Sequence, residues 1–566
     1  MAGYSGFVIV LTMRRVVPDF LRSKFSSRES GFNRRDLFRQ GGLLSLVGAF
    51  PAFSKVNSGT SNTATKVNSH GELYRAIGVR PVINARGTFT IITGSETLPE
   101  VKQAMDDASR AYVQMDELMD GVGKRLAELT QAEWGIVTNG CCAALTHCTT
   151  ACIAGSNPER MQRLPDLRGL KDEVIIPEYS RNVYDHAIRM VGVKIVEMKE
   201  RSELDSGFNE NTAMVYILAG EGDTGPLGTQ AVSEVARRHN VPVIVDAAAE
   251  VLTIPNVHLQ RGATAVAYSG GKCIRGPQSA GLLLGEKNLL QAAWANSAPH
   301  HAFGRSLKVG KEEIMGMLAA VEMWTKRDYE AESREWQKWL DQIAAKVTKV
   351  NGVTTRVEPP EGLSNKTPVL RIEWDGTRLG ITGQEVSKVL LDTEPRIIFG
   401  SASGNRPYNM ASSVSITPYM MMPGDHEIVA ERLYEVLSKP PKFQNPVLPQ
   451  GQLAVIAGQW EAQLEFGRGS ATHTLIFEQD GANLVGTHRG EYVSGDLSGT
   501  VAVNQVHFRS SQKIQGTRLF FEFSGTVDGD KMAGDVNMGE YGEARWSAQR
   551  HEYQAPRGVV KPVKRA

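Results

Sequence analysis

The stretch that decides the fold is Val241-Pro242-Val243-Ile244-Val245-Asp246-Ala247-Ala248-Ala249-Glu250, a short apolar run that ends in a carboxylate. A run of this length, rich in β-branched residues, is typical of a strand buried on both faces. Ligands of open α/β sheets bind beyond the carboxyl ends of such strands, which is where Asp246 lies. Taken alone, Asp246 fits better as the N-cap of a following helix.

Similar apolar runs alternate with amphipathic segments on both sides of this stretch. Within the segment 230–239, for example, Val232, Val235 and Ala236 share one helical face. Strands alternating with helices predict a parallel α/β sheet that is covered on both faces. The expected buried strands are 135–138, 174–176, 193–197, 214–218, 241–246, 263–268 and 281–284.

The chain of 566 residues is too long for one core, and its texture changes along its length. One helical segment is expected over 311–350, followed by mixed strands and helices. After residue 452, eight short strands separated by turn signals such as Asp480-Gly481 predict an antiparallel barrel or sandwich. The expected divisions are a leader (1–56), a linker (57–71), a large domain (72–325, with 72–100 as its entry segment), a small α+β domain (326–440), a linker (441–451), a β domain (452–550) and a disordered tail (551–566).

The amino-terminal segment resembles a twin-arginine export signal. Asn33-Arg34-Arg35-Asp36-Leu37-Phe38-Arg39 precedes an apolar stretch, 41–53, which suits a signal-peptide core better than a membrane span. We therefore expect a periplasmic protein, or one held at the membrane by an uncleaved signal. A cytoplasmic protein with a basic leader is the alternative, and no other membrane span is expected.

Bulk composition argues against two classes of partner. The formal net charge is +1, so there is no electrostatic reason to expect nucleic acid. The five cysteines are odd in number and four of them crowd into 141–152, which indicates buried thiols in a helix rather than disulfides or zinc. The histidines of the β domain, at 473, 488 and 507, are interpreted as core or surface residues. No metal is expected.

Three further motifs join Asp246 in a consistent order. Asn139-Gly140-Cys141-Cys142 opens a helix with small residues, whose backbone N–H groups can approach a phosphate. Ser269-Gly270-Gly271-Lys272 follows the next expected strand, 263–268, where a desolvated lysine can bind a carbonyl cofactor covalently. Arg275 then offers a guanidinium to a phosphate or carboxylate. A pyridoxal 5'-phosphate (PLP) site on this architecture needs an anion-binding turn, an aspartate at a strand end and a Ser-x-x-Lys motif. The aspartate would keep the pyridine nitrogen of the cofactor protonated.

The run Ser269-Gly-Gly-Lys272-Cys-Ile-Arg-Gly276-Pro277-Gln278 resembles the lysine motif of the selenocysteine synthase (L-seryl-tRNA selenium transferase) superfamily. Ile83-Asn84-Ala-Arg-Gly87-Thr88 is similar to the opening Asn-x-x-Gly stretch of that family. The likeness covers about Arg80 to Leu437, and it is closer to the branch of D-glucosaminate-6-phosphate ammonia-lyase-like proteins. It implies the aspartate-aminotransferase fold (fold type I) for the large and small domains.

The resemblance also implies roles for individual residues. Lys272 would be the cofactor lysine and catalytic base. The implied cofactor-binding residues are Gly140, Cys141, Cys142, His186, Asp246, Ala248, Ser269 and Lys272, with His186 stacking on the ring. The candidate arginines for substrate anions are Arg86, Arg181, Arg275, Arg305 and Arg396.

The chain departs from the selenium transferases at two places. Ile92-Thr93-Gly94-Ser95-Glu96 replaces a run that carries an arginine in that family, and the leader and linker leave no room for a tRNA-binding domain. We therefore expect a PLP-dependent lyase that acts on a small amino acid or amino-sugar acid by α-proton abstraction and β-elimination, as at least a homodimer. The alternatives are a transferase, racemase or aldolase, or a non-catalytic exported scaffold.

Overall fold

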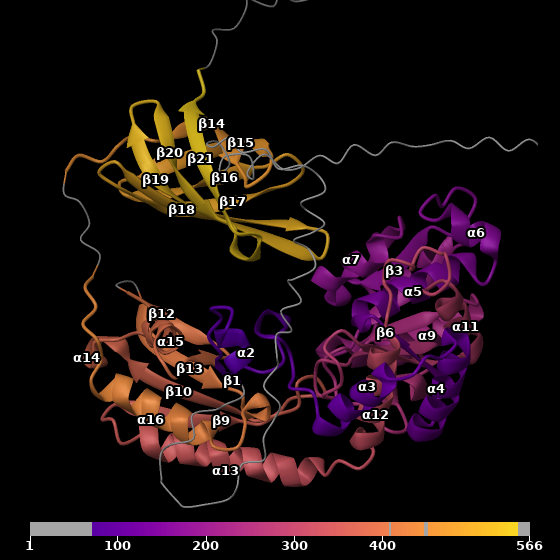
Figure 1. The fold of residues 1–566 in the computed structure, drawn as a ribbon. Coiled ribbons are helices and arrows are strands. Elements are labelled where there is room, and N and C mark those ends of the chain that lie inside the picture. The colour runs from indigo at the N-terminus through magenta and orange to yellow at the C-terminus, as the bar shows by residue number, and fades with distance from the viewer. Residues whose placement is uncertain (1–70, 407–408, 446–450, 553–566) are drawn as a thin grey trace, which may run out of the picture. The chain divides into compact units, whose positions relative to one another are not determined.

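The computed structural model describes residues 71–406, 409–445 and 451–552. The predicted leader, nearly all of the first linker and residues 553–566 of the predicted tail lie outside the described residues. The described chain forms a large α/β domain, a smaller α+β domain and a β-barrel, and each is considered by itself (Figure 1). Within these described ranges, no helix is both long enough and apolar enough to cross a membrane.

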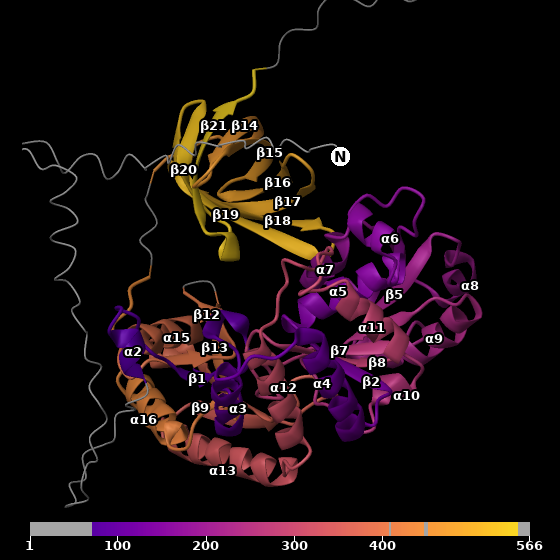
Figure 2. The ribbon, with the colours of Figure 1, turned by 45° about the vertical axis from the view of Figure 1, so that its right-hand side comes forward.

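The large domain is built on a seven-stranded sheet in the order β2-β8-β7-β6-β5-β3-β4. Each of the seven predicted strands is present. Their bounds are β2 Trp134–Thr138, β3 Glu173–Pro177, β4 Lys194–Met198, β5 Thr212–Leu218, β6 Val243–Asp246, β7 Ala265–Ser269 and β8 Gly281–Gly285. Figure 2 shows β7, β8 and β2 side by side.

The prediction of a fully parallel sheet is wrong at one strand. β8 lies antiparallel to both of its neighbours, β7 and β2, whereas the other pairs are parallel. The loop between β7 and β8 contains no crossover helix, so the chain turns back and enters the sheet in the opposite direction.

Helices flank this sheet on the pattern that the amphipathic segments predict. α5 is buried on nearly all sides, because its small residues let it pack against β5–β8 and also against α7 and α11. The helices of the domain are α3 Pro99–Ser109, α4 Met115–Thr130, α5 Gly140–Ala154, α6 Pro158–Arg163, α7 His186–Arg189, α8 Leu204–Gly207, α9 Thr229–Arg238, α10 Val257–Gln260, α11 Lys287–Ala295 and α12 Lys311–Trp324.

The small domain has a four-stranded antiparallel sheet in the order β12-β13-β10-β9. The helix expected over 311–350 is two helices, because Asp328 accepts a hydrogen bond from the Ala331 amide and starts a new one. The elements of the small domain are α13 Tyr329–Val347, β9 Val353–Glu358, β10 Val369–Asp375, α14 Gly376–Leu379, α15 Gly383–Asp392, β11 Ile397–Phe399, β12 Ala402–Asn405, β13 Asn409–Ile416 and α16 Asp425–Ser438. The entry segment contains α2 Glu72–Arg75 and β1 Ile83–Ala85, and β1 pairs with β11.

The β domain is a closed antiparallel barrel of eight strands, drawn in yellow and orange in Figure 1, which confirms the predicted all-β domain and decides for a barrel over a sandwich. Inward side chains alternate with exposed ones, and the interior is filled by large aromatics such as Trp460, Phe508 and Trp546. Its strands are β14 Gly458–Glu465, β15 Ser470–Asp480, β16 Asn483–Arg489, β17 Ser494–Ala502, β18 Gln505–Ile514, β19 Thr517–Asp528, β20 Lys531–Asn537 and β21 Glu543–Arg550.

Candidate active site

Three strand ends of the large domain open toward one edge of its sheet. β2, β6 and β7 run in the same direction, because β8 is antiparallel to both β2 and β7 and β6 is parallel to β7. Their carboxyl ends lead to Gly140, Asp246 and Ser269. Gly140, which precedes the other two by more than a hundred positions, therefore shares with them the edge where ligands of α/β sheets bind.

Glycines open the space between the first and third of these strand ends. Gly281 of β8 pairs with Thr138 on one side and with Ser269 on the other. A Cβ added to Gly281 would lie 2.4 Å from the backbone carbon of Gly140, so a side chain at this point would collide with the first turn of α5. Gly140 itself has a φ of +74°, which favours glycine.

The first turn of α5 and Ser269 supply donors for an anion. The first N–H groups of a helix have no partners within the helix, and the helix dipole favours a negative charge there. The Asn139 side chain does not cap them, because it donates to the Lys308 carbonyl oxygen, 3.1 Å away. Within the described ranges the Ser269 hydroxyl makes no hydrogen bond. These donors have the chemistry that a phosphate requires.

Asp246 is buried and receives hydrogen bonds at both carboxylate oxygens. The Tyr216 hydroxyl donates to Oδ2 at 3.0 Å, and the Ala248 amide and the Cys141 thiol donate to Oδ1 at 3.1 Å and 3.4 Å. Asn182 in turn donates its amide Nδ2 to the Tyr216 hydroxyl oxygen at 2.9 Å. The carboxylate is therefore held in one orientation at the end of β6.

All three donors to Asp246 are neutral groups. Burial, followed by the charge of Asp246, raises the pKa of the Cys141 thiol and of the Tyr216 hydroxyl well above their ordinary values, so both keep their protons. Burial and Asp246 also raise the pKa of Cys142, whereas the charge of Lys272 lowers it. That opposing effect of Lys272 on both cysteines means that its ammonium lies near the start of α5 and Asp246.

Lys272 lies in a tight loop after β7 and is half-buried. The Gly270 amide donates to the Ala280 carbonyl oxygen and the Gly276 amide donates to the Gly270 carbonyl oxygen, both at 2.8 Å. A Cβ on Gly270 would lie 2.8 Å from two carbonyl oxygens, so only glycine fits there. In the part of the chain that the structure describes, the Lys272 amine has no hydrogen bond and no carboxylate partner, which leaves it available for chemistry.

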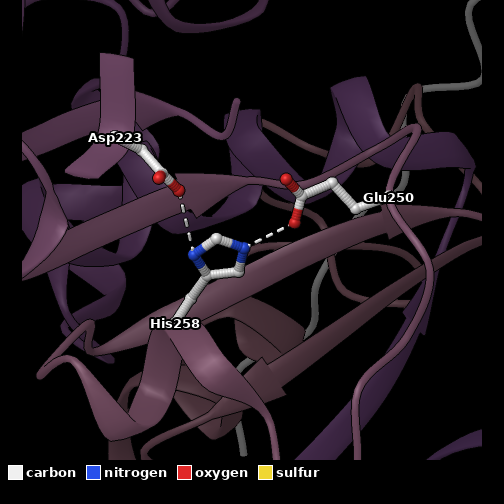
Figure 3. A group of neighbouring side chains, drawn as sticks. All are labelled: Asp223, Glu250 and His258. Carbon is white, nitrogen blue, oxygen red and sulfur yellow. Dashed lines mark hydrogen bonds and ion pairs between the residues drawn. The ribbon is translucent and has the colours of Figure 1, made fainter. Parts of the chain in front are cut away.

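A group that sequence reasoning missed lies beside this site. His258 of α10 stands between Glu250 and Asp223, and all three side chains are buried (Figure 3). We call these three residues the buried clamp. The His258 Nε2 atom is 2.6 Å from a Glu250 oxygen, and its Nδ1 atom is 3.4 Å from an Asp223 oxygen, within ion-pair range but not a completed hydrogen bond. Arg261 also faces Asp223, with Nη1 3.3 Å from Oδ1.

The geometry of the buried clamp favours hydrogen bonding over metal binding. It is a group of His, Asp and Glu residues in the described ranges whose ligand atoms are close enough to share an ion. However, the two carboxylates face opposite nitrogens of one ring, and a histidine offers only one nitrogen to a given ion. A carboxylate can only accept, so the Nε2 atom carries a hydrogen and donates it to Glu250. The clamp reaches the cofactor loop because the Cys273 thiol donates to the Glu250 carbonyl oxygen at 2.8 Å.

Two of the candidate substrate arginines have structural partners instead. The guanidinium of Arg181 binds Asp185 through Nε and Glu197 through Nη1, both at 2.7 Å, and its side chain is 6% exposed. Arg396 donates to backbone carbonyl oxygens, including that of Arg80 at 2.9 Å. Both guanidinium groups are therefore engaged within the protein.

The guanidinium groups of the other three candidate arginines differ in how many partners they have within the protein. The amides of Arg86 and Gly87 donate to the Asn84 side-chain oxygen, which explains the predicted Asn-x-x-Gly stretch as a turn. Within the described ranges, the Arg86 guanidinium has no carboxylate partner and its buried Nε atom has no hydrogen bond. Arg275 donates Nε to the Glu96 carbonyl oxygen at 2.9 Å, and burial lowers its pKa. Arg305 is exposed.

A second tyrosine, Tyr184, lies near the cofactor site. His186, predicted to stack on the ring, is exposed on α7 and has no resolved interaction with Asp246. Burial raises the pKa of Tyr184, and the charges of Cys142 and Asp246 raise it further, so its hydroxyl lies near those groups. Tyr184 is also 51% exposed, as a side chain that faces a ligand would be. The sequence offered only a weak signal for it, a lone tyrosine in a loop.

Comparison with known proteins agrees with this geometry. Residues 184–305 match the family model for class-V aminotransferases. The chain is 29% identical over 377 residues to D-glucosaminate-6-phosphate ammonia lyase of Salmonella typhimurium (strain 14028s / SGSC 2262), covering 64% of this chain and 97% of that protein. A solved structure of D-glucosaminate-6-phosphate ammonia-lyase matches with a TM-score of 0.57 at 28% identity, over 64% of this chain and 98% of the other. This chain is a PLP-dependent enzyme of fold type I.

Two further relatives show how widely the chemistry of similar chains varies. A 5'-C-glycyluridine monooxygenase-decarboxylase of Streptomyces sp is 29% identical over 390 residues, covering 66% of this chain and 94% of the relative. The L-seryl-tRNA(Sec) selenium transferase of Proteus mirabilis (strain HI4320) is 23% identical over 290 residues, covering 46% of this chain and 60% of the relative. The comparisons confirm the predicted cofactor, the fold class and the resemblance to the ammonia-lyase branch of the superfamily.

The residues present in this PLP enzyme fit the cofactor. A partner-free amine at Lys272 suits its aldehyde, and the backbone donors of α5 with the Ser269 hydroxyl suit its phosphate. The Asp246 carboxylate, held by neutral donors, suits a pyridine nitrogen. The small side chain of Ala248, whose amide orients Asp246, leaves room beside a ring.

Proposed function

We propose that this PLP enzyme is a lyase that releases ammonia from a small amino acid or amino-sugar acid. The observation that carries the proposal is the match to D-glucosaminate-6-phosphate ammonia lyase along 97% of that relative. The PLP cofactor, when bound, supplies an electron sink for the pair left at the α-carbon after a proton departs. A 2-amino-3-hydroxy acid then loses its 3-hydroxyl group as one molecule of water, which leaves an enamine. The released enamine tautomerises to an imine, and one molecule of water hydrolyses this imine to ammonia and a 3-deoxy-2-keto acid.

The residues of the chain would share this work. The Lys272 amine takes the α-proton, because it is the partner-free base beside Asp246 and the start of α5. Asp246 would hold the pyridine nitrogen of the bound cofactor by a charge-assisted hydrogen bond, and the Tyr216 hydroxyl keeps that carboxylate in place. Ser269 and the amides of Gly140–Cys142 bind the phosphate. The Arg86 guanidinium is our first choice for an anionic group of the substrate, because it lacks a carboxylate partner within the described ranges.

The experiment is a substrate screen that reads both products. Purified enzyme loaded with PLP is mixed with D-glucosaminate 6-phosphate, D-glucosaminate and a panel of amino acids, and ammonia and keto acid are measured in parallel. We expect equal amounts of both products from an amino-sugar acid. Keto acid that forms only when a second keto acid is added would indicate an aminotransferase, and loss of optical activity without ammonia would indicate a racemase; either result overturns the lyase.

Replacing Lys272 tests the catalytic role directly. Lys272→Ala should lose the absorbance of lysine-bound PLP near about 420 nm and lose turnover. Lys388→Ala is the matched control, because Lys388 is 74% exposed on α15 and pairs only with Asp392. Retention of absorbance and turnover in Lys272→Ala would contradict the assignment. Wild-type protein that stays colourless with added PLP would favour a scaffold.

A second candidate function rests on the monooxygenase-decarboxylase relative, whose identity equals that of the ammonia lyase. Such a reaction would also begin at the α-carbon of an amino acid, but it would consume oxygen and release carbon dioxide. An oxygen electrode and a carbon dioxide assay on the same substrate panel separate the two. Oxygen uptake that matches product formation would favour the second candidate.

We further propose that the enzyme works as a homodimer after export. Light scattering coupled to size-exclusion chromatography tests the dimer, and a monomer with full activity would contradict it. Arg34 and Arg35 belong to the twin-arginine-type motif, so a double lysine variant should lose recovery in the periplasmic fraction. Unchanged recovery of that variant would contradict export by this route.

A further inference from the structure

One end of the β-barrel contains a cavity of about 240 Å³. Its walls are mainly aromatic and aliphatic, with Phe466, Leu519, Phe521 and Met538 among them. The rim carries Tyr492, Phe520 and Tyr541, all more than half exposed. A closed barrel of eight strands has an interior that side chains can fill or that one small ligand can share. Here the aromatic core fills one part and the cavity occupies another.

The floor of the cavity is polar and internally ordered. The Nδ1 atom of His473 is 2.8 Å from Nε2 of His488, and Nδ1 of His488 is 2.5 Å from the Ser510 hydroxyl oxygen. Gln512 donates its amide Nε2 to the His488 carbonyl oxygen at 3.1 Å. These four residues come from strands β15, β16 and β18, and each is at least nine-tenths buried. The network fixes the orientation of both histidine rings and of the glutamine amide.

Two polar atoms of this network are left without partners, and both open toward the cavity. Within the described ranges, neither Nε2 of His473 nor Oε1 of Gln512 makes a hydrogen bond, although the two residues are only 6% and 1% exposed. Both residues line the cavity, together with Gly490. A Cβ built on Gly490 would lie 3.3 Å from Oε1 of Gln512 and 3.6 Å from Nε2 of His473, so the two atoms converge on one point.

The electrostatics of the floor select an uncharged ligand. Burial lowers the pKa of His473, and burial together with His473 lowers the pKa of His488 to about 3. Both rings are therefore neutral at physiological pH. The charge of Glu491 raises the pKa of His473 slightly against this effect of burial, and Glu491 lines the cavity as an exposed side chain. If Ser510 donates to His488, the chain of hydrogen bonds leaves an N–H donor on Nε2 of His473. Gln512 supplies an acceptor beside it.

We propose that the barrel binds a neutral, single-ring molecule with a hydroxyl group in this cavity, the hydroxyl meeting His473 and Gln512. A donor next to an acceptor matches a hydroxyl group, which accepts one hydrogen bond and donates another. A cavity of about 150 Å³ is enough to hold benzene, so 240 Å³ admits one substituted ring. The aromatic walls would stack on such a ring. This site is independent of the proposed lyase activity.

Calorimetry with the full-length holoenzyme tests the proposal, with p-cresol as the probe. We expect saturable binding with one site per chain, weaker binding of toluene by about tenfold because it lacks the hydroxyl group, and no binding of benzoate. His473→Gln should weaken p-cresol binding by a similar factor. His507→Gln is the matched control, because His507 is exposed on β18 and faces Glu522 outside the barrel. It should bind p-cresol like the wild type.

A space-filling variant keeps the test decisive if His473→Gln does not fold. Ala471 is buried and lines the cavity two residues before His473 on the same inward face of β15. Ala471→Phe should abolish binding while leaving the polar floor intact. The proposal is overturned if p-cresol shows no saturable binding to the wild type, if toluene binds as tightly as p-cresol, or if Ala471→Phe binds like the wild type.

Discussion

Replacing His258 with leucine tests whether the buried clamp stabilises the large domain. The substitution removes the Nε2 contact to Glu250 at 2.6 Å and the Nδ1 contact to Asp223 at 3.4 Å. Glu250 and Asp223 are 3% and 4% exposed, so water cannot replace the lost partner. Breaking a buried ion pair by removing one partner costs about 3–5 kcal/mol. Arg261 continues to face Asp223, so most of this cost falls on Glu250.

The expected change is large enough for calorimetry. At roughly 2–4 °C per kcal/mol for a domain of this size, His258→Leu should lower the Tm of the large domain by about 6–20 °C. His301→Leu is the matched control, because the His301 side chain is exposed, and its Tm should stay near the wild-type value. Treatment with EDTA should change neither wild type nor variant. If His258→Leu has the same Tm as the wild type, the buried clamp does not stabilise the domain. If EDTA lowers the Tm of the wild type only, the three residues bind a metal ion instead.

Three further perturbations give separate readouts. Tyr216→Phe removes a hydrogen bond to the buried Asp246 carboxylate and should weaken PLP retention by about tenfold or more, measured by dialysis and absorbance. Unchanged retention would contradict the role of Tyr216. Burial lowers the pKa of His488 to about 3, below its ordinary value of about 6.5. The contribution of neutral His488 to the stability of the barrel is therefore complete above pH 6.5 and falls by about 3 kcal/mol by pH 4. Hydrogen exchange of the barrel strands should show this loss in the wild type and not in His488→Gln. Arg86→Gln should raise KM for a phosphorylated or carboxylate substrate by about tenfold with little change in kcat, and a fall in kcat alone would place Arg86 elsewhere in the reaction.

The sequence predicted the parts of the fold that local patterns determine. The seven predicted apolar runs correspond to seven strands, because a buried strand requires consecutive apolar residues that are visible in the sequence. The direction of β8 depends on the absence of a crossover helix before it, and periodicity within a strand carries no information about direction. The break between α12 and α13 depends on the cap at Asp328, within a segment whose composition is helical throughout.

The same distinction applies to the site. Asp246, Ser269 and Lys272 were predictable because each lies at or just after the carboxyl end of a strand, where side chains reach a ligand. Tyr216 lies inside β5, where every neighbour is buried too, so nothing in the sequence marks its hydroxyl as the one that reaches Asp246. The buried clamp joins residues from three different segments, and Tyr184 is one tyrosine among several. Neither the buried clamp nor the position of Tyr184 could be predicted from the sequence, because only tertiary contacts bring these residues together with their partners.

Two buried aspartates at the same edge of the sheet have opposite surroundings, and the contrast supports the cofactor assignment. Asp223, after β5, faces the cations of Arg261 and, when protonated, His258, so its charge is balanced within the protein. Asp246, after β6, receives only neutral donors from Cys141, Tyr216 and the backbone, and in the described ranges it has no ion pair. Neutral donors orient a carboxylate without neutralising it, which leaves its charge to stabilise a proton on a bound ring. A cation at the place of Tyr216 would compete with that proton, so the burial of a tyrosine there, with its pKa raised, is the arrangement that a pyridine nitrogen requires.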